Sequence, residues 1–407
     1  EVVIVVEETP FPAFLLPPPI LLDHLLEIVH DLLVLFTRHH GGRRLLHLGD
    51  VHSVRGVVGV DVFDGQCFFA SALLATAAAR GEPYRLETVA SGLHHPWSVA
   101  QLPDHSFLVT ERRGRLLHIG REGGQQSLGG VPGTYVAGQG GFFDVVLHPR
   151  FTDNRLVYLS YAAGGPGANA TAVFRGRLTA SGLADGEEIL RVRPLKGTPQ
   201  HYGGRLAFLP DGTLLLTTGE GFDYREAAQD PAGELGKVLR IHDDGTVPAD
   251  NPLAEAGTRR VWSLGHRNPQ GLVVDPVSGE IWLHEHGPRG GDEVNRLTPG
   301  ANYGWPAVTH GIDYSGAIVS PYRHWPGMID PEHVWIPSIA PSGLALYRGD
   351  RFPAWRGDLF VGALVDREVR RLDLEDGVLV GEESLFGELE ERIRDVRCAR
   401  DGFLYLL

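Results

Sequence analysis

From Pro83 onward the sequence alternates short apolar runs with glycine, proline and aspartate, and this pattern constrains the fold more than any other feature. Runs such as Ser106–Glu111, Leu156–Tyr161 and Thr213–Thr218 favour β-strands, and the residues between them favour tight turns. No long helical period competes with these runs. The 53 glycines and 28 prolines of the 407-residue chain suit many such turns. We therefore predict an all-β fold for residues 83–407.

A weak internal repeat organises these strands. An apolar strand, a turn and a second strand recur about every 45–70 residues, which is the length of one four-stranded propeller blade with its loops. The turns of the repeat lie at Pro103-Asp104, His148-Pro149, Pro210–Gly212, Ser342–Leu344, Asp275-Pro276 and Arg400–Gly402. The spacing predicts a six-bladed β-propeller of four-stranded antiparallel blades over residues 83–407. Two packed β-sandwiches are the alternative.

Residues 1–82 do not share this pattern and are expected to form a non-homologous N-terminal extension. Segment 67–79 is similar to the apolar core of a secretory signal, although the basic stretch that normally precedes it is missing. One interpretation is that residues 1–66 are misassigned coding sequence and that the protein is periplasmic or secreted. The other is a helical or poorly ordered extension. The final strand, which reaches Leu407, is expected to be truncated.

Charge and cysteine content exclude several classes of function. The net charge of −14 disfavours a nucleic-acid or anionic-membrane partner. Charged side chains interrupt the apolar segment Ile20–Phe36, so no transmembrane helix is expected. Cys67 and Cys398 provide no disulfide framework, and two free thiols are expected.

Two groups of side chains suggest chemistry. His201 precedes two glycines that permit close approach of a ligand, and an imidazole titrates near neutral pH, so His201 is a candidate general base. Arg267 and Asn268 combine a guanidinium with an amide, which suits carboxylates and carbonyls of an anionic cofactor. Each also has an ordinary structural explanation, as a loop histidine and as a salt-bridged turn.

Several ordered motifs extend this pattern along the chain. They are H-P-W-S at His95–Ser98, G-Q-G-G-F-F-D-V at Gly138–Val145, H-Y-G-G-R-L at His201–Leu206, G-H-R-N-P-Q-G at Gly265–Gly271, E-H-G-P-R-G-G-D-E at Glu285–Glu293 and R-I-R-D-V at Arg392–Val396. With these motifs, residues 82–407 resemble the soluble aldose sugar dehydrogenases that use pyrroloquinoline quinone (PQQ), the glucose/sorbosone dehydrogenase family.

The resemblance implies a set of roles. His201 would take the proton from the anomeric hydroxyl of an aldose while a hydride passes to PQQ. Arg267 would stabilise the charge that develops on the quinone. The cofactor would be held by Gln139, His201, Arg267, Asn268, Arg392 and Arg394. The alternation of Arg392 and Arg394 predicts that both point from one face of a strand.

The resemblance also implies calcium, which prefers oxygen ligands. The turn at Gly287-Pro288 would offer backbone carbonyls to an ion that also binds the quinone. A second, structural ion would be bound by Asp292, Glu293 and the carbonyl of Tyr303.

One position departs from the family. A lysine is typical after a G-A-L strand, whereas Gly362-Ala363-Leu364 is followed here by Val365. Arg367 is a candidate substitute, although a guanidinium does not replace an ammonium conservatively. The departure calls the affinity for the cofactor into question.

The leading hypothesis is therefore a PQQ-dependent enzyme that oxidises aldoses to lactones and passes electrons to an external acceptor, as a monomer or homodimer. A metal-dependent propeller lactonase is one alternative, against which Arg267, Arg392 and Arg394 argue. A non-catalytic propeller that binds carbohydrate or protein is the other.

Overall fold

The structure is a computed structural model of the 407-residue chain, and it describes residues 2–7, 46–47, 57–58, 62–63, 66–67, 84–255 and 259–407. Most of the expected N-terminal extension lies outside these residues, as does nearly all of the signal-like segment 67–79. The chain divides into two compact units, one of residues 1–6 and 86–407 and the other of residues 7–85. In the second unit, β2 (Leu46–His47) pairs with β3 (Val57–Val58), and β4 (Val62–Phe63) pairs with β5 (Gln66–Cys67).

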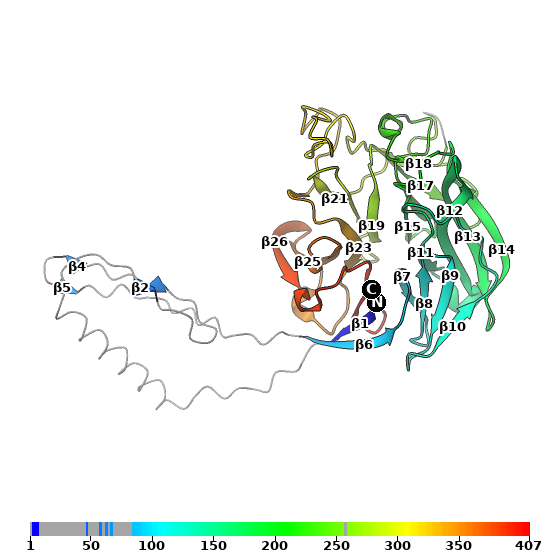
Figure 1. The fold of residues 1–407 in the computed structure, drawn as a ribbon, viewed down its shortest axis with the longest axis horizontal. Helices are drawn as coiled ribbons and strands as arrows, with labels where there is room; N and C mark the ends of the chain where they lie inside the picture. Colours follow the sequence, from blue (N-terminus) through cyan, green and yellow to red (C-terminus); the bar gives the residue numbers. More distant parts are fainter. Residues whose placement is uncertain are drawn as a thin grey trace. The chain divides into compact units, whose positions relative to one another are not determined.

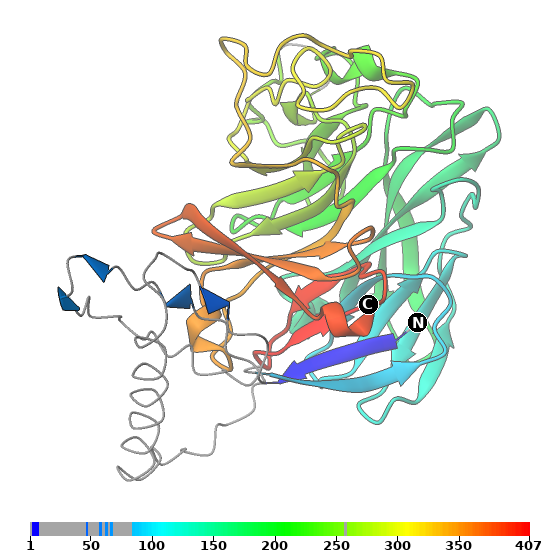
Figure 2. The same cartoon turned by 60° about the vertical axis from the view of Figure 1, so that its left-hand side comes forward.

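The larger unit is an all-β propeller (Figures 1 and 2). Five four-stranded sheets are each built from consecutive strands. The strands of each sheet are given from the innermost outward. The first sheet contains β7 (Pro96–Gln101), β8 (Phe107–Glu111), β9 (Arg115–Ile119) and β10 (Gln125–Leu128). The second contains β11 (Phe142–Leu147), β12 (Leu156–Gly165), β13 (Ala168–Leu178) and β14 (Leu183–Arg191). The third contains β15 (Gly203–Phe208), β16 (Leu214–Thr218), β17 (Lys237–Ile241) and β18 (Val261–Leu264). The fourth contains β19 (Pro269–Val274), β20 (Ile281–Glu285), β21 (Asp292–Arg296) and β22 (His333–Trp335). The fifth contains β23 (Pro341–Leu346), β24 (Leu359–Ala363), β25 (Val369–Glu375) and β26 (Val378–Leu385).

A further four-stranded sheet is composite. Its strand order is β27 (Val396–Cys398), β28 (Leu404–Leu406), β1 (Val2–Glu7) and β6 (Arg85–Ser91). Both ribbon views show the two ends of the chain side by side at this sheet. The prediction of six blades within residues 83–407 is therefore wrong, because that stretch contains five complete blades. The turn repeat does not reveal how many strands each copy supplies, and the last copy supplies only β27 and β28.

Burial along the strands follows their position in the blades. All five residues of β16 are buried, as are all five of β20 and of β24, because neighbouring blades cover both faces of these strands. The outermost strand β26 is largely exposed. The apolar core is accordingly a ring of layers between sheets; one layer joins Leu206 and Leu216 to Tyr158 and Val173 of the preceding blade.

A β-bulge lies near the start of the innermost strand in each of the five complete blades. The register shifts between Pro96 and Ser98 in β7, and equivalent shifts occur in β11, β15, β19 and β23. A bulge re-aims the side chain of the extra residue. These bulges place Trp97, Phe143 and Gln270 in the lining of a central cavity.

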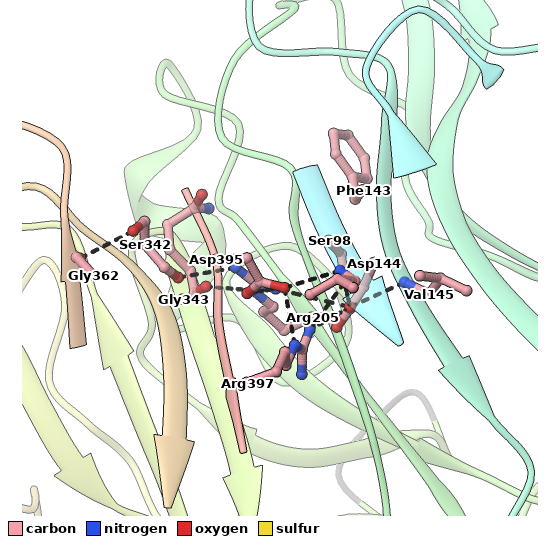
Figure 3. A network of polar contacts seen from close by, with 12 residues as sticks. Ser98, Phe143, Asp144, Val145, Arg205, Ser342, Gly343, Gly362, Asp395 and Arg397 are labelled. Atoms are coloured by element: carbon pink, nitrogen blue, oxygen red, sulfur yellow. Dashed lines mark hydrogen bonds and ion pairs between the residues drawn. The ribbon is translucent and has the colours of Figure 1, made fainter. Parts of the chain in front are cut away.

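A buried ion network joins the innermost strands around the propeller axis (Figure 3). Arg205 contacts Asp395 at 2.8 Å and Asp144 at 3.8 Å. Arg397 contacts Asp144 at 2.6 Å and Asp395 at 2.9 Å. Arg205 also donates hydrogen bonds to the carbonyls of Gln270 and Ser342. Since Asp144 is on β11, Arg205 on β15 and Arg397 on β27, the network connects blades that are distant in sequence.

Helical structure in the described residues is limited to short turns. These are α2 (Phe151–Asn154), η1 (Arg225–Ala228), η2 (Pro353–Trp355) and η3 (Gly387–Leu389). Within those same ranges, no helix combines the length and apolar character needed to cross a membrane.

Candidate active site

A cavity of about 700 Å³ opens among the loops that precede the innermost strands. Polar and aromatic side chains from different blades meet in its lining. They include Trp97, Arg112, Gln139, Asn268, Arg392 and Arg394. The structure thus brings together four of the predicted cofactor ligands, Gln139, Asn268, Arg392 and Arg394. Arg112 is an addition that sequence reasoning missed, because nothing in its local sequence distinguishes it from other turn arginines.

Three arginines, Arg112, Arg392 and Arg394, and one glutamate, Glu391, line the cavity, so its lining carries a net positive charge. Burial and the positive charges of Arg205, Arg392 and Arg112 together lower the pKa of Arg394 to about 10. The negative charge of Asp395 compensates only in part. Arg392 is exposed, and Arg112 and Arg394 are half-buried. Their like charges repel one another, and an anion placed among them would relieve this repulsion. The cavity is therefore suited to a ligand with several negative charges.

Arg392 and Arg394 reach the cavity from a segment that precedes β27, and not from a strand as their alternation predicted. The backbone N–H of Arg394 donates to the carbonyl of Leu407 at 2.5 Å, and the N–H of Leu407 donates to the carbonyl of Asp395 at 3.0 Å. These bonds fix the segment in an extended form without a full strand ladder.

His201 lies beside the cavity, and its neighbours Tyr202 and Gly203 line it. The His201 side chain is buried, and its backbone N–H donates to Oε1 of Gln139 at 2.8 Å. Nδ1 of His201 contacts Oε1 of Glu220 at 3.1 Å. Burial lowers the pKa of His201, and the contact with Glu220 opposes this effect. The imidazole is consequently neutral near pH 7 and able to accept a proton.

Glu220 is a functional candidate that sequence reasoning missed. It is 1% exposed and follows the buried strand β16 in the sequence T-G-E-G. A carboxylate between two glycines after a buried strand is a signal that the sequence offers. The structure explains the first glycine: a Cβ on Gly219 would lie 2.3 Å from the carbonyl oxygen of His201, so no side chain fits there. The backbone N–H of Glu220 donates to the carbonyl of Arg267 at 2.9 Å, which ties Glu220 to the next blade.

Asn268 connects the His201 loop to the β19 blade. Its Oδ1 accepts hydrogen bonds from the backbone N–H of Gly203 at 3.2 Å and from Nε2 of Gln270 at 3.3 Å. With its oxygen directed to Gly203, the amide NH₂ group of Asn268 remains the donor on this side of the cavity.

Arg267 is adjacent to the cavity but does not line it. Its Nη1 donates to the carbonyls of Gly287 at 2.6 Å and His286 at 3.1 Å, and its guanidinium lies over the ring of Trp305. The Nε of Arg267 is buried and finds no hydrogen-bond partner among the described residues. A second, small void of about 10 Å³ lies next to Arg267, with Glu285 and Glu293 in its wall.

The predicted calcium turn is tightly closed. Oδ1 of Asp292 accepts from the N–H of Gly287 at 2.8 Å and from Oγ of Ser338 at 3.1 Å, and Oδ2 accepts from the N–H of Ala340 at 2.9 Å. Burial raises the pKa of Asp292 to about 6 against these hydrogen bonds. Pro288 lies inside this turn. Asp292 therefore holds the Gly287–Asp292 turn against the segment before β23.

Glu293 has a different environment. Burial and the negative charge of Glu285 raise its pKa well above the usual range, so a cation near these two carboxylates would be stabilised. The Tyr303 ring stacks on His266, and its hydroxyl donates to the carbonyl of Arg296. Across the parts of the chain that the structure describes, no three His, Cys, Asp or Glu side chains are grouped as a metal site.

The segment that contains Val365 and Arg367 places no positive charge in the cavity. Val365 is 59% exposed, and it is the preceding residue, Leu364, that lines the cavity. The guanidinium of Arg367 donates to the carbonyl of Glu390 at 3.3 Å on the exposed surface. Arg367 therefore does not place its charge in the cavity.

Comparison with known proteins agrees with this geometry. Residues 93–407 match the family model described as glucose/sorbosone dehydrogenase. The chain is 41% identical to the aldose sugar dehydrogenase YliI of Escherichia coli, over 84% of this chain and 95% of that protein.

Solved structures are similar over the same region. A glucose dehydrogenase crystal structure is 46% identical, with a TM-score of 0.76 over 79% of this chain and 95% of that one. The PQQ-bound aldose sugar dehydrogenase of Streptomyces coelicolor is 28% identical, with a TM-score of 0.65 over 79% of this chain and 90% of that one. The chain belongs to the glucose/sorbosone dehydrogenase family.

Proposed function

We propose that the protein is a quinoprotein that oxidises the anomeric carbon of aldose sugars to lactones, with PQQ as the hydride acceptor and an external acceptor for the electrons. The observation that carries this proposal is a cavity with three arginines, Arg112, Arg392 and Arg394, beside the buried pair of His201 and Glu220. Membership of the family and the PQQ-bound relative support it.

The residues of the cavity fit PQQ, a planar tricarboxylate. Three guanidinium groups match three carboxylates in charge. The neighbouring arginines contribute to the lowered pKa of Arg394, and a bound carboxylate would offset their repulsion. A volume of about 700 Å³ lies within the range of cofactor sites. Trp97, Phe143 and Tyr202 offer aromatic surface for a planar ring system. Gln139 and Asn268 add amide groups near the same surface.

When bound, PQQ would supply an electrophilic quinone carbon that accepts a hydride. The chain would do the rest. His201 would accept the proton of the anomeric hydroxyl while the C–H bond gives up its hydride, so that both hydrogens removed from the sugar, one as a hydride with two electrons and one as a proton, are accounted for. Glu220 would stabilise the imidazolium that forms, at 3.1 Å from Nδ1.

Arg267 would act on the other reaction partner. Its Nε has no hydrogen-bond partner among the described residues, although it is buried, and a developing negative charge nearby would satisfy it. The aromatic ring of Trp305, 5.2 Å from the guanidinium, restricts the orientations that Arg267 can adopt. We therefore assign Arg267 to charge stabilisation during hydride transfer.

Calcium is part of the proposal. The carbonyls of Gly287 and Pro288 would hold one ion at the cofactor, and Arg267 presently donates to the first of these carbonyls. A second ion would draw on Glu293 and the Tyr303 carbonyl. Asp292 fits this second site less well, because both of its carboxylate oxygens already accept hydrogen bonds from the turn.

A periplasmic or secreted location is also part of the proposal, because it would match the signal-like segment 67–79.

Reconstitution tests the function directly. The purified chain should bind PQQ in the presence of calcium and then reduce an artificial dye with several aldoses. Binding without dye reduction would favour the non-catalytic propeller that binds carbohydrate or protein. Lactone hydrolysis with a metal ion alone, without any quinone, would favour the lactonase. Absence of PQQ binding and of dye reduction would refute the proposal.

A further inference from the structure

Lys196 is a buried cation beside the proposed base that the mechanism above does not use. It is 1% exposed, and Lys196 and Lys237 are the only lysines in the sequence. Its backbone forms a bridge with Asn169, with reciprocal N–H to carbonyl distances of 2.8 and 2.9 Å. Lys196 therefore has a fixed main chain from which its side chain extends towards the His201 loop.

The ammonium of Lys196 holds the segment that carries His201. Nζ donates to the carbonyl of Thr198 at 2.7 Å and to Oδ1 of Asn169 at 3.1 Å. It also lies 3.4 Å from the ring centroid of Tyr202, the residue that follows His201. The hydroxyl of Tyr202 in turn donates to the same oxygen of Asn169 at 2.7 Å. Contacts on both sides of His201 thus converge on one ammonium group.

Lys196 is also close to the carboxylate that partners His201. The aliphatic part of the Lys196 side chain packs against Gly221, the residue that follows Glu220. A Cβ on Gly221 would lie 2.9 Å from Cδ of Lys196. Burial lowers the pKa of Lys196 to about 7, and attraction to Glu220 opposes the shift. Thr198 closes the arrangement by donating from Oγ1 to the carbonyl of Gly221 at 2.5 Å.

We propose that Lys196 is a positioning residue for His201, whose buried ammonium fixes the Lys196–Tyr202 segment and opposes protonation of the imidazole. This inference rests on the proposed role of His201 as the base. A positive charge beside His201 lowers the pKa of its imidazole. The imidazole therefore stays neutral, and able to accept a proton from substrate, down to a lower pH than it would without that charge.

The charges that face His201 come from four segments. Glu220 favours the protonated imidazole, whereas Arg267 and Lys196 disfavour it. His286, bonded to the carbonyl of Pro341, has a pKa lowered to about 3 by burial and is uncharged in this range. The pKa of His201 lies below 6.5, and Lys196 is mainly protonated there because its own pKa is about 7. Removal of Lys196's charge should therefore raise the pKa of His201.

Lys237 supplies a matched control. It is fully buried, its pKa is also lowered to about 7 by burial, and its Nζ donates to three backbone carbonyls. Those carbonyls belong to Ala227, Ala228 and Leu235, which are not part of the His201 loop. A Lys237→Met variant removes the same charge from an equally buried place.

The test measures the pKa of His201 by NMR in cofactor-free protein with labelled histidine, the signal being assigned with a His201→Asn variant. Lys196→Met and Lys196→Gln should raise this pKa by about half a unit or more. Lys196→Arg and Lys237→Met should leave it near the wild-type value. An unchanged pKa in the uncharged Lys196 variants would overturn the proposal, whether or not the protein oxidises sugars.

Wild-type protein gives a test that needs no lysine variant. The His201 signal should titrate in two steps, one below pH 6.5 for its own proton and a smaller one near pH 7 for the Lys196 ammonium. A single step would count against the inference. In reconstituted enzyme, the acidic limb of the kcat/KM profile should move to higher pH in Lys196→Met but not in Lys237→Met. A loss of kcat at all pH values with no shift of the limb would indicate a merely structural role.

Discussion

Burial, the carboxylate of Glu220 and the positive charges of Arg267 and Lys196 set the pKa of His201. Desolvation alone would make the imidazole a weak base, and the contact with Glu220 at 3.1 Å restores part of its basicity. The positive φ of 45° at His201 belongs to a turn that continues through Gly203 and Gly204. The glycines permit this turn, because only a residue without a side chain adopts such angles at low cost. His201 is thus held in place by its backbone as well as by Gln139 and Glu220.

Replacement of His201 by alanine should abolish most of the turnover. We expect kcat to fall by about 10²–10⁴-fold, the usual contribution of a general base. PQQ affinity should fall much less, because Gln139, Asn268, Arg392 and Arg394 still line the cavity. Steady-state kinetics and a fluorescence titration with PQQ measure the two quantities. As a control, His324→Ala alters an exposed histidine paired with Asp330 and should have no effect. Full activity in His201→Ala would place the base elsewhere.

Val365→Lys should strengthen cofactor binding. The new ammonium would follow Leu364 at the cavity and add a positive charge near an anionic ligand. We expect the Kd for PQQ to fall several-fold, and the gain to shrink at high salt because exposed charges are screened. Val365→Leu is the control for size. If the lysine variant binds no more tightly than the leucine variant, the departure at Val365 does not limit affinity.

At the scale of elements, the innermost strands and the turns before them build the site. The β-bulge near the start of each complete blade directs one extra residue inward, including Trp97 and Gln270. Tight turns then present backbone groups, as at Gly287–Asp292, where the Asp292 carboxylate joins two loops. The site is therefore a set of equivalent strand ends that have acquired different side chains.

Asp292→Asn should loosen the Gly287–Asp292 turn. An amide offers one acceptor and one donor group, so it cannot accept from the N–H groups of both Gly287 and Ala340. We expect a loss of about 1–3 kcal/mol in the free energy of unfolding, which chemical denaturation measures. Asp366→Asn changes a more exposed carboxylate and should cost much less. Equal losses in the two variants would contradict a specific role for Asp292.

At the scale of the whole molecule, a central ion network closes the propeller. Two aspartates and two arginines, Asp144, Arg205, Asp395 and Arg397, balance each other's charge around the axis (Figure 3). Trp97 lies over Arg205 at 4.1 Å and also lines the cavity, so the network and the site share a wall. Damage to the network should therefore affect both stability and cofactor binding.

Arg205→Met should be strongly destabilising. It leaves two buried carboxylates with less positive charge between them, and such a loss typically costs about 3–5 kcal/mol. Arg177→Met is the matched control, because it removes the same side chain from an exposed pair with Asp185 and should cost less than about 1 kcal/mol. Thermal and chemical unfolding of both variants measure the difference. A cost for Arg205→Met as small as for Arg177→Met would show that the network does not close the ring.

The sequence by itself determined the fold class and pointed to several residues of the cavity lining. Alternating apolar runs require sheets. The resemblance of the motifs to the family singled out Gln139, Asn268, Arg392 and Arg394, because each motif is a short contiguous stretch that can be recognised without the fold. The sequence also named His201, which lies where its neighbours line the cavity.

Only the tertiary structure decided which distant residues act together. The position of Arg112 at the cavity depends on how separate blades meet at the axis. The pairing of His201 with Glu220 depends on the antiparallel pairing of β15 with β16, which brings the residues before one strand beside the residues after the other. A local sequence pattern contains neither piece of information. The sequence also did not reveal that β1 completes a sheet with β28, or that the ammonium of Lys196 reaches the ring of Tyr202 in the same loop. The first contact is fixed by pairing of strands far apart in the chain, and the second by the way in which the loop before β15 folds back on itself.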